Sequence, residues 1–260
     1  MVFGEVLSMI LPLSQLMRRA IEQTLEDRIA IAFSGGLDSS IIASIAKKDS
    51  EVELFSAGVV GCEDLPASEK VAFELGLPLV EVIMDEGKVM DAYRKCHSIL
   101  KLDLLKLDIL VPVYCVAEAA SKKGHKIMLF GSGAEELFVG YERYFKYEGN
   151  DLDSVLREEY RTLIHRDIGW VKRICRHFCI DARFPFYDKE LSQAVFAIPL
   201  KERMHDRELK KIVLREVGKM LGAPPTALKR KKKAMQYGTG VHKIIIKHAD
   251  EINREFPPAD

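Results

Sequence analysis

A strand-like run that ends at two adjacent glycines constrains the fold of this chain more than any other feature. Residues 28–33 are largely apolar, Gly35 and Gly36 follow, and a helical pattern of apolar residues begins at Leu37. Glycine lets the backbone approach a ligand closely, and the first amides of a helix have no partner within the helix. A strand, a glycine turn and a helix start in this order therefore favour the binding of an anion.

The side chains around these glycines suit a phosphate group. Ser34, Ser39 and Ser40 supply hydroxyl donors for phosphate oxygens, and Asp38 lies among them. A carboxylate is a poor neighbour for phosphate unless a divalent cation lies between the two. A nucleotide with Mg²⁺ satisfies all of these residues, whereas a serine-capped turn without a ligand is the alternative for a glycine pair alone. The string is neither a Walker A loop nor Gly-x-Gly-x-x-Gly.

Length and composition indicate a folded chain of one domain, residues 1–260. Of its 260 residues 48% are hydrophobic, which is enough to bury a full core. Lys plus Arg and Asp plus Glu number 39 each, so no net field attracts nucleic acid or an anionic membrane. The five cysteines form no Cys-x-x-Cys pair, and no apolar stretch reaches membrane-spanning length. We expect a cytoplasmic protein without membrane contact, for which nucleic acid is a disfavoured partner.

Strands and helices alternate through the first half of the chain. Four apolar runs are typical of strands: residues 28–33, 52–58, 79–84 and 126–130. Helical patterns separate them, so we predict a doubly wound parallel sheet covered on both faces, with residues 26–140 as the nucleotide-binding core. The long crossover over residues 86–123 predicts that the fourth strand lies beside the first. The loops at Ser34 and Gly131 would then be neighbours at the carboxyl edge of the sheet.

Both ends of the chain are expected to be helical. Ser14, which follows Pro12, predicts the start of a helix that leads into the first strand. Residues 151–260 show apolar residues at helical spacing and no strand pattern, so they predict a helical C-terminal part.

A second glycine turn shows the same order of strand, glycine turn and helix start. Residues 131–133 follow the fourth strand, and Glu135 and Glu136 lie in the first turn of the helix after it. Acids in that position are favoured by the helix dipole, with no functional role. They also suit a Mg²⁺ site opposite Asp38, because hard cations take oxygen ligands from more than one side. The two interpretations stand equal on these residues alone.

A basic run over residues 229–233 precedes Gly238 and Gly240. On charge alone such a run is a solvated stripe. Flanking glycines also suit a loop that closes over a polyphosphate, where an ammonium such as that of Lys232 stabilises developing charge.

Together these motifs resemble the synthetase domain of the asparagine synthetases, which belong to the N-type ATP pyrophosphatases of the PP-loop family. The motifs that carry the resemblance lie at residues 34–40, 54–61, 112–114, 126–141, 182–188 and 228–240. The resemblance implies an adenine nucleotide alpha hydrolase-like fold and an ATP-dependent carbon–nitrogen ligase. In that family a carboxylate attacks the α-phosphorus of ATP, and ammonia displaces AMP from the acyl adenylate.

The family pattern also implies roles for individual residues. The residues implied to bind ATP and pyrophosphate are Ser34, Gly35, Gly36, Leu37, Asp38, Ser39 and Ser40. Those implied to lie against the adenosine are Ala32, Ala57 and Gly131. Asp38 and Glu135 would hold Mg²⁺, and Lys232 would act with them in catalysis by neutralising charge on the phosphates. Arg183 and Asp188 are expected to hold a rigid aromatic turn by interacting with each other.

Three departures from the family pattern affect the substrates. Val2 stands where glutamine-using members have a catalytic cysteine, so we expect nitrogen to come from free ammonia, a separate glutaminase subunit or another amine. Ser132 replaces a glutamate that binds ammonia, and serine is too weakly basic to replace it. Glu136 or Glu142 would then have to substitute. Asp108 stands where the family has an arginine that grips the substrate carboxylate. Either this pocket takes an amine, or a local insertion shifts the alignment.

The sequence thus predicts an ATP- and Mg²⁺-dependent ligase that adenylates a small-molecule carboxylate, with aspartate as the default, and amidates it with ammonia or an amine. Its substrate pocket would include Asp108, Ser132 and Glu136. One alternative is a PP-loop enzyme that modifies tRNA, and another is a non-catalytic ATP-binding subunit that partners a separate glutaminase.

Overall fold

A computed structural model describes residues 3–147, 150–204, 208–231 and 235–257. Its centre is a five-stranded sheet in the order β3-β2-β1-β4-β5, in which every neighbouring pair is parallel. The strands are β1 (Arg28–Ala32), β2 (Glu51–Val59), β3 (Leu79–Met84), β4 (Ile127–Leu129) and β5 (Asp181–Arg183). The predicted doubly wound parallel sheet is confirmed.

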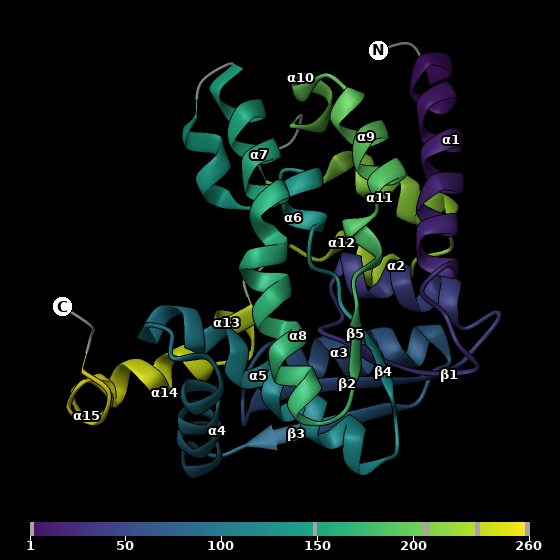
Figure 1. The fold of residues 1–260 in the computed structure, drawn as a ribbon. Helices are drawn as coiled ribbons and strands as arrows, with labels where there is room; N and C mark the ends of the chain where they lie inside the picture. Colours follow the sequence, from purple (N-terminus) through teal and green to yellow (C-terminus); the bar gives the residue numbers. More distant parts are fainter. Residues whose placement is uncertain (1–2, 148–149, 205–207, 232–234, 258–260) are drawn as a thin grey trace.

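Helices cover the sheet and extend beyond it (Figure 1). Those before β4 are α1 (Phe3–Glu22), α2 (Leu37–Ala46), α3 (Asp64–Leu75), α4 (Glu86–Leu100) and α5 (Leu104–Lys122). Those after β4 are α6 (Ala134–Leu137), α7 (Asn150–Thr162), α8 (Asp167–His177), α9 (Lys189–Ala197), α10 (Leu200–Arg203), α11 (Ile212–Met220), α12 (Pro225–Lys229), α13 (Met235–Gly238), α14 (Val241–Lys247) and α15 (Ala249–Glu255). Three 3₁₀ turns lie at Glu142–Lys146, Leu163–His165 and Pro185–Tyr187.

The central strand β1 divides its side chains between two buried clusters. Ile29 and Ile31 pack with α1, α2, α3, α9 and α11 on one face of the sheet. Ala30 faces the other cluster, which α4, α5, α8 and α14 cover. Successive residues of a strand point to opposite faces, so a strand buried on both sides is apolar throughout. This explains why β1 is apolar at every position after Arg28.

The turns after β1 and β4 lie side by side, as the long crossover predicted. Ala30 of β1 pairs with Met128 of β4, and the winding reverses between these two strands. A Cβ added to Gly131 would lie 3.0 Å from the Cβ of Asp38. A larger residue at position 131 would therefore push the two turns apart.

The N-terminal helix differs from its prediction. It does not begin at Ser14: α1 starts at Phe3 and runs through Pro12. The Ser14 hydroxyl donates a hydrogen bond to the carbonyl of Leu11 (2.8 Å) instead of capping the helix. Proline removes a backbone donor but does not stop a helix whose buried face is well packed, and Leu13 and Met17 of this helix are buried.

The C-terminal part contains a strand that the sequence did not predict, and the predicted Arg183–Asp188 interaction is wrong. Strand β5 is only three residues long and pairs with β4. On it, Arg183 donates to the carboxylate of Asp181 (2.8 Å) and to the carbonyl of Thr24 (2.9 Å). Asp188 instead caps α9 by accepting the N–H of Leu191 (2.8 Å). A short edge strand with one apolar residue carries too little periodicity to be recognised.

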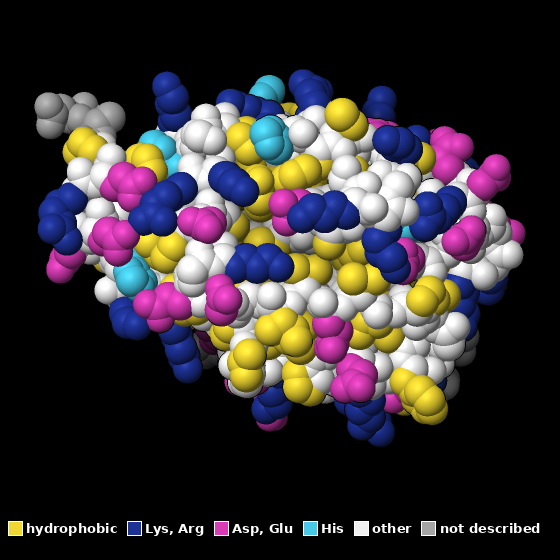
Figure 2. Space-filling model, turned by 90° about the horizontal axis from the view of Figure 1, so that it is seen from below, with side chains coloured by type: hydrophobic (Ala, Val, Ile, Leu, Met, Phe, Trp, Pro, Cys, Tyr) yellow, Lys and Arg dark blue, Asp and Glu magenta, His cyan; other side chains and the backbone are white. Residues whose placement is uncertain are grey.

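No helix in the described ranges is long and apolar enough to cross a membrane. On the face shown in Figure 2, Lys and Arg side chains lie next to Asp, Glu and hydrophobic side chains. That face therefore mixes both signs of charge, in agreement with the balanced composition.

Candidate active site at the carboxyl edge of the sheet

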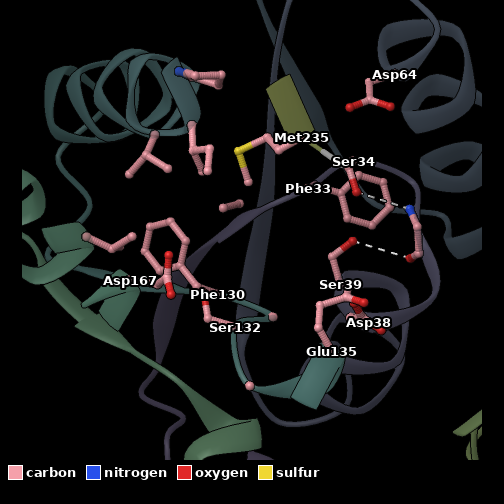
Figure 3. Close-up of a pocket in the computed structure, with 18 of the residues that line it drawn as sticks. Phe33, Ser34, Asp38, Ser39, Asp64, Phe130, Ser132, Glu135, Asp167 and Met235 are labelled. Carbon is pink, nitrogen blue, oxygen red and sulfur yellow. Dashed lines mark hydrogen bonds between the residues drawn. The ribbon is translucent and has the colours of Figure 1, made fainter. Parts of the chain in front are cut away.

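A cavity of about 440 Å³ opens at the carboxyl ends of β1, β2 and β4. It lies beside the point where the winding reverses, which is where ligands bind in open α/β sheets. The predicted site residues that line it are Ala32, Ser34, Gly36, Leu37, Asp38, Ser39, Ala57, Gly131, Ser132, Glu135 and Glu136. Figure 3 shows Ser34, Asp38 and Ser39 on one side of this cavity and Phe130 and Asp167 on the other.

Three other predicted site residues, Gly35, Ser40 and Asp108, are not among the residues that line the cavity. Lys232 lies outside the described residues, so its position remains a prediction from the sequence.

The turn between β1 and α2 leaves the N-terminus of α2 open to an anion. Gly36 is the N-cap residue, its backbone is extended, and no side chain caps the helix. The N–H of Gly36 donates to Ser34 Oγ (3.3 Å), and Ser39 Oγ lies 3.4 Å from the carbonyl of Gly36 (Figure 3). The helix amides and two hydroxyls therefore gather at one wall of the cavity, where the helix dipole favours negative charge.

Gly35 and Ser40 support this turn from behind. Gly35 has a positive φ of 65°, and a Cβ there would lie 2.6 Å from the carbonyl oxygen of Ala67 in α3. Ser40 Oγ donates to the carbonyl of Gly36 (2.7 Å). These two residues shape the loop, and the cavity-lining positions are Ser34, Gly36 and Ser39.

Asp38 and Glu135 point at a common cation, which is a lysine of the chain itself. The ammonium of Lys211 donates to both carboxylate oxygens of Asp38 (2.9 and 2.8 Å) and to Oε1 of Glu135 (2.8 Å). Only 3% of Lys211 is exposed. Asp38 follows β1 and Glu135 follows β4, so the paired turns bring together two acids 97 positions apart in the chain, and Lys211 reaches them from the start of α11.

This pair of carboxylates fits a Mg²⁺ ion that arrives with a nucleotide. The Lys211 ammonium shows that both acids can share one cation. No group of three or more His, Cys, Asp or Glu side chains forms a metal cage among the residues described. Mg²⁺ is typically bound by one or two carboxylates, with phosphate oxygens and waters as its remaining ligands. Asp38 and Glu135 would be those two carboxylates.

Lys211 is a site residue that reasoning from the sequence missed. Lys210 and Lys211 precede the apolar pattern of α11, and two adjacent lysines before a helix normally indicate a solvated surface. A lysine is rarely buried unless it is paired, and its partners here are 173 and 76 positions away. No local signal in the sequence identifies it.

Glu136 is a second buried acid of α6 in the lining of the cavity. Only 3% of it is exposed, and burial, with a smaller contribution from the charge of Glu135, raises its pKa to about 7. Ser132 lines the same cavity. A carboxyl with a pKa near neutrality can accept a proton from an amine at physiological pH, which a serine hydroxyl cannot do.

Arg166 provides a positively charged group in this part of the cavity. Its Nη2 donates to the carbonyl of Glu159 (3.0 Å), whereas its Nε is buried and has no hydrogen-bond partner among the described residues. Arg143, also in the lining, is paired with the Glu159 carboxylate (2.7 Å). A buried guanidinium N–H without an acceptor is costly, so the position is suited to a carboxylate ligand.

The remaining lining is apolar and aromatic. Phe130 stacks on Phe184 with ring centroids 5.5 Å apart, and Val113, Trp170 and Met235 also line the cavity. Such a surface suits the flat apolar part of a nucleotide or substrate.

Asp108 is held in a different environment from the one expected. It is 1% exposed, and its Oδ2 lies 2.7 Å from Nδ1 of His242 in α14. Burial raises the pKa of Asp108, and the hydrogen bond with His242 opposes that rise. Its neighbours Ile109 and Leu110 in α5 line the cavity. The Asp108 carboxyl instead contacts His242 of α14.

The basic segment is attached to the phosphate-binding turn through Arg230. One guanidinium nitrogen of Arg230 donates to Asp64 (2.6 Å), and another donates to the carbonyl of Ser34. Asp64 is 4% exposed, and a Cβ at Gly238 would lie 2.3 Å from its carboxylate. Arg230 in the basic run and Gly238 after it therefore both pack against Asp64 in the first turn of α3.

Comparison with known proteins identifies the family. The sequence profile of the Asparagine synthase family matches residues 13–169 and 147–256. A protein of Methanocaldococcus jannaschii, provisionally named asparagine synthetase (glutamine-hydrolyzing) 1, is 29% identical in an alignment of 259 positions, gaps included, that covers 86% of this chain and 48% of that protein. Asparagine synthetase B of Escherichia coli K12 is 26% identical, over 86% of this chain and 45% of that protein. The chain thus spans about half the length of these relatives.

Two solved structures are similar in outline. One is NMN synthetase from Francisella tularensis, with a TM-score of 0.47 and 12% identity over 94% of this chain and 86% of that one. The other is the U34-tRNA thiolase NcsA from Methanococcus maripaludis, with a TM-score of 0.45 and 12% identity over 94% of this chain and 75% of that one. The profile match covers most of the chain and contains both glycine turns and the basic segment. This chain belongs to the asparagine synthase family.

Proposed function

We propose that this protein is an ATP-dependent, amide-forming ligase. It adenylates a substrate carboxylate with release of pyrophosphate and then transfers the acyl group to ammonia or another amine. The observation that carries this proposal is the convergence of Asp38 and Glu135 beside the uncapped N-terminus of α2. A polyphosphate with its Mg²⁺ satisfies both the free helix amides and the paired carboxylates.

The residues have distinct roles in this reaction. Ser34, Gly36 and Ser39 hold the phosphates that leave as pyrophosphate, while Ala32, Ala57 and Gly131 lie against the adenosine. Mg²⁺, when bound to Asp38 and Glu135, screens the phosphate charge. The substrate carboxylate oxygen attacks the α-phosphorus, and the bond to the pyrophosphate oxygen breaks. Lys232 would stabilise the charge on that leaving group, a role that rests on the sequence alone.

Glu136 is the proposed proton acceptor of the second step. The amine nitrogen attacks the acyl carbon, AMP leaves, and the proton lost by nitrogen passes to the carboxylate. Its raised pKa and its place in the cavity lining support this role. Glu136 would thus compensate for serine at position 132.

The default substrate is aspartate, and Arg166 is its proposed carboxylate receptor. The buried, unpartnered Nε of Arg166 supports a ligand with a carboxylate beyond the one that reacts. The Asp108 carboxyl is paired with His242, so its negative charge does not exclude such a ligand from the cavity.

The five cysteines are free, which supports a reducing cytoplasm as the compartment.

The test is a pyrophosphate-release screen with ATP, Mg²⁺ and single carboxylates, each with ammonium or glutamine as nitrogen donor. We expect aspartate with ammonium to yield AMP, pyrophosphate and asparagine, identified by mass spectrometry. Parallel assays with glutamine, with and without an added glutaminase, identify the nitrogen donor.

Other results would change the assignment. AMP formation that requires tRNA would make the protein a tRNA-modifying enzyme. ATP binding without pyrophosphate release from any carboxylate or tRNA would make it a nucleotide-binding subunit and would contradict the ligase.

A further inference from the structure

Lys211 occupies the position at which a metal ion would bridge the two carboxylates. Its ammonium donates to both carboxylate oxygens of Asp38 and to Oε1 of Glu135, at 2.8 to 2.9 Å. The three side chains are 2%, 15% and 8% exposed, so water screens this cluster poorly. Two carboxylates and one ammonium thus interact directly in a nearly closed space.

The chain holds this ammonium in place by unusual local geometry. Lys210 and Lys211 both have positive φ, 47° and 53°, which costs about 1–2 kcal/mol for each residue that has a Cβ. A Cβ on Gly140 would lie 2.4 Å from Cε of Lys211 and 1.7 Å from Oε2 of Glu135. The strained start of α11 and the missing side chain at position 140 together make room for the lysine.

The same oxygens cannot serve the ammonium and a metal ion at once. Mg²⁺ requires oxygens at about 2.0–2.1 Å in an octahedral arrangement, whereas the ammonium keeps them at hydrogen-bond distance. A metal ion must therefore displace the Lys211 ammonium from the pair.

We propose that Lys211 is a built-in counter-ion that closes the Asp38–Glu135 site to free divalent metal and yields it only to metal that arrives with nucleotide phosphates. This inference rests on the proposed use of Asp38 and Glu135 as metal ligands. Free Mg²⁺ would leave the ammonium buried without a partner, which is strongly unfavourable. Nucleotide phosphates bring negative charge to the N-terminus of α2, where the displaced ammonium finds new acceptors. Metal entry is thereby coupled to substrate entry.

The experiment measures Mn²⁺ binding to the nucleotide-free protein by electron paramagnetic resonance. Lys211→Met removes the ammonium and keeps a side chain of similar length. We expect it to bind Mn²⁺ about tenfold more tightly than the wild type, or better. Its melting temperature should be lower than that of the wild type without metal and should recover when Mn²⁺ is added.

Lys210→Met is the matched control, because Lys210 also has a positive φ but its ammonium pairs with Glu142 (2.6 Å). It should bind Mn²⁺ like the wild type. If Lys211→Met does not fold, Lys211→Gln provides the same measurement with a neutral polar side chain.

Two outcomes separate the possible failures. Equal Mn²⁺ affinity of the wild type and the Lys211 variant would overturn the counter-ion proposal. Tight binding that survives Asp38→Asn in the Lys211→Met background would instead show that Asp38 is not a metal ligand, which contradicts the site assignment in the proposed function.

Discussion

At the scale of single residues, Glu136 is an acid whose protonation changes on folding. Its pKa is raised from the usual 4.5 to about 7, so the folded protein binds this proton more tightly than the unfolded chain. Its contribution to stability is complete below pH 4.5 and is lost as the pH rises through 7. The same burial that makes Glu136 a usable base at neutral pH therefore destabilises the protein in alkali.

The substitution Glu136→Gln tests both consequences. Relative to the wild type, the free energy of unfolding of the variant should rise by about 2–3 kcal/mol between pH 4.5 and pH 8. Amide formation should fall by about 10²-fold or more, while carboxylate-dependent pyrophosphate exchange persists. Chemical denaturation across this pH range is the measurement, and Glu142→Gln, at an exposed carboxyl, is the control. The same pH slope in wild type and Glu136→Gln would refute the raised pKa.

A second residue-scale prediction concerns Arg166. Removing a charged hydrogen bond to a carboxylate costs about 1.5–3 kcal/mol, so Arg166→Gln should raise KM for the carboxylate substrate by about tenfold or more. The KM for ATP should stay the same, because the phosphate-binding turn lies at the other wall. Arg173→Gln, on the exposed side of α8, serves as the control. An unchanged carboxylate KM would exclude Arg166 as the receptor.

At the scale of elements, the turn between β1 and α2 depends on its fit against α3. The sequence identified this turn as a phosphate site because glycines and hydroxyls are a local signal. It did not show that the carbonyl of Ala67 leaves no room for a side chain at position 35. Helix α3 packs onto the turn only in the folded protein.

Two glycines with nearly equal φ allow the contribution of this packing to stability to be measured. Gly35 and Gly76 have φ of 65° and 66°, but only Gly35 would bring its added Cβ into contact with other atoms. Gly76→Ala should cost about 1–2 kcal/mol through φ alone. Gly35→Ala should cost more and should also weaken ATP binding, because the turn must shift. Thermal unfolding and calorimetric ATP titration distinguish them, and equal losses in both variants would contradict the packing role of Gly35.

At the scale of the whole molecule, sheet order decides which residues meet. The adjacency of β1 and β4 follows from crossover length and was predicted, and it places the turns that carry Asp38 and Glu135 together. Strand β5 at the sheet edge was not predicted, and it directs Arg183 to Asp181 and Thr24. Long strands with buried faces leave a pattern in the sequence, whereas a three-residue edge strand is defined by its neighbour.

The sequence by itself determined the parallel sheet, the phosphate-binding turn and the resemblance to the asparagine synthetases, because periodicity and short motifs are properties of adjacent residues. Only the tertiary structure showed that Lys211 lies between Asp38 and Glu135, and that Asp108 pairs with His242. It also showed that Nε of Arg166 is buried with no hydrogen-bond partner among the described residues. Each of these depends on contacts between side chains whose positions along the chain are far apart or on burial that the chain acquires on folding. A lysine next to a lysine looks like surface in a sequence, and burial between two acids makes it part of the site.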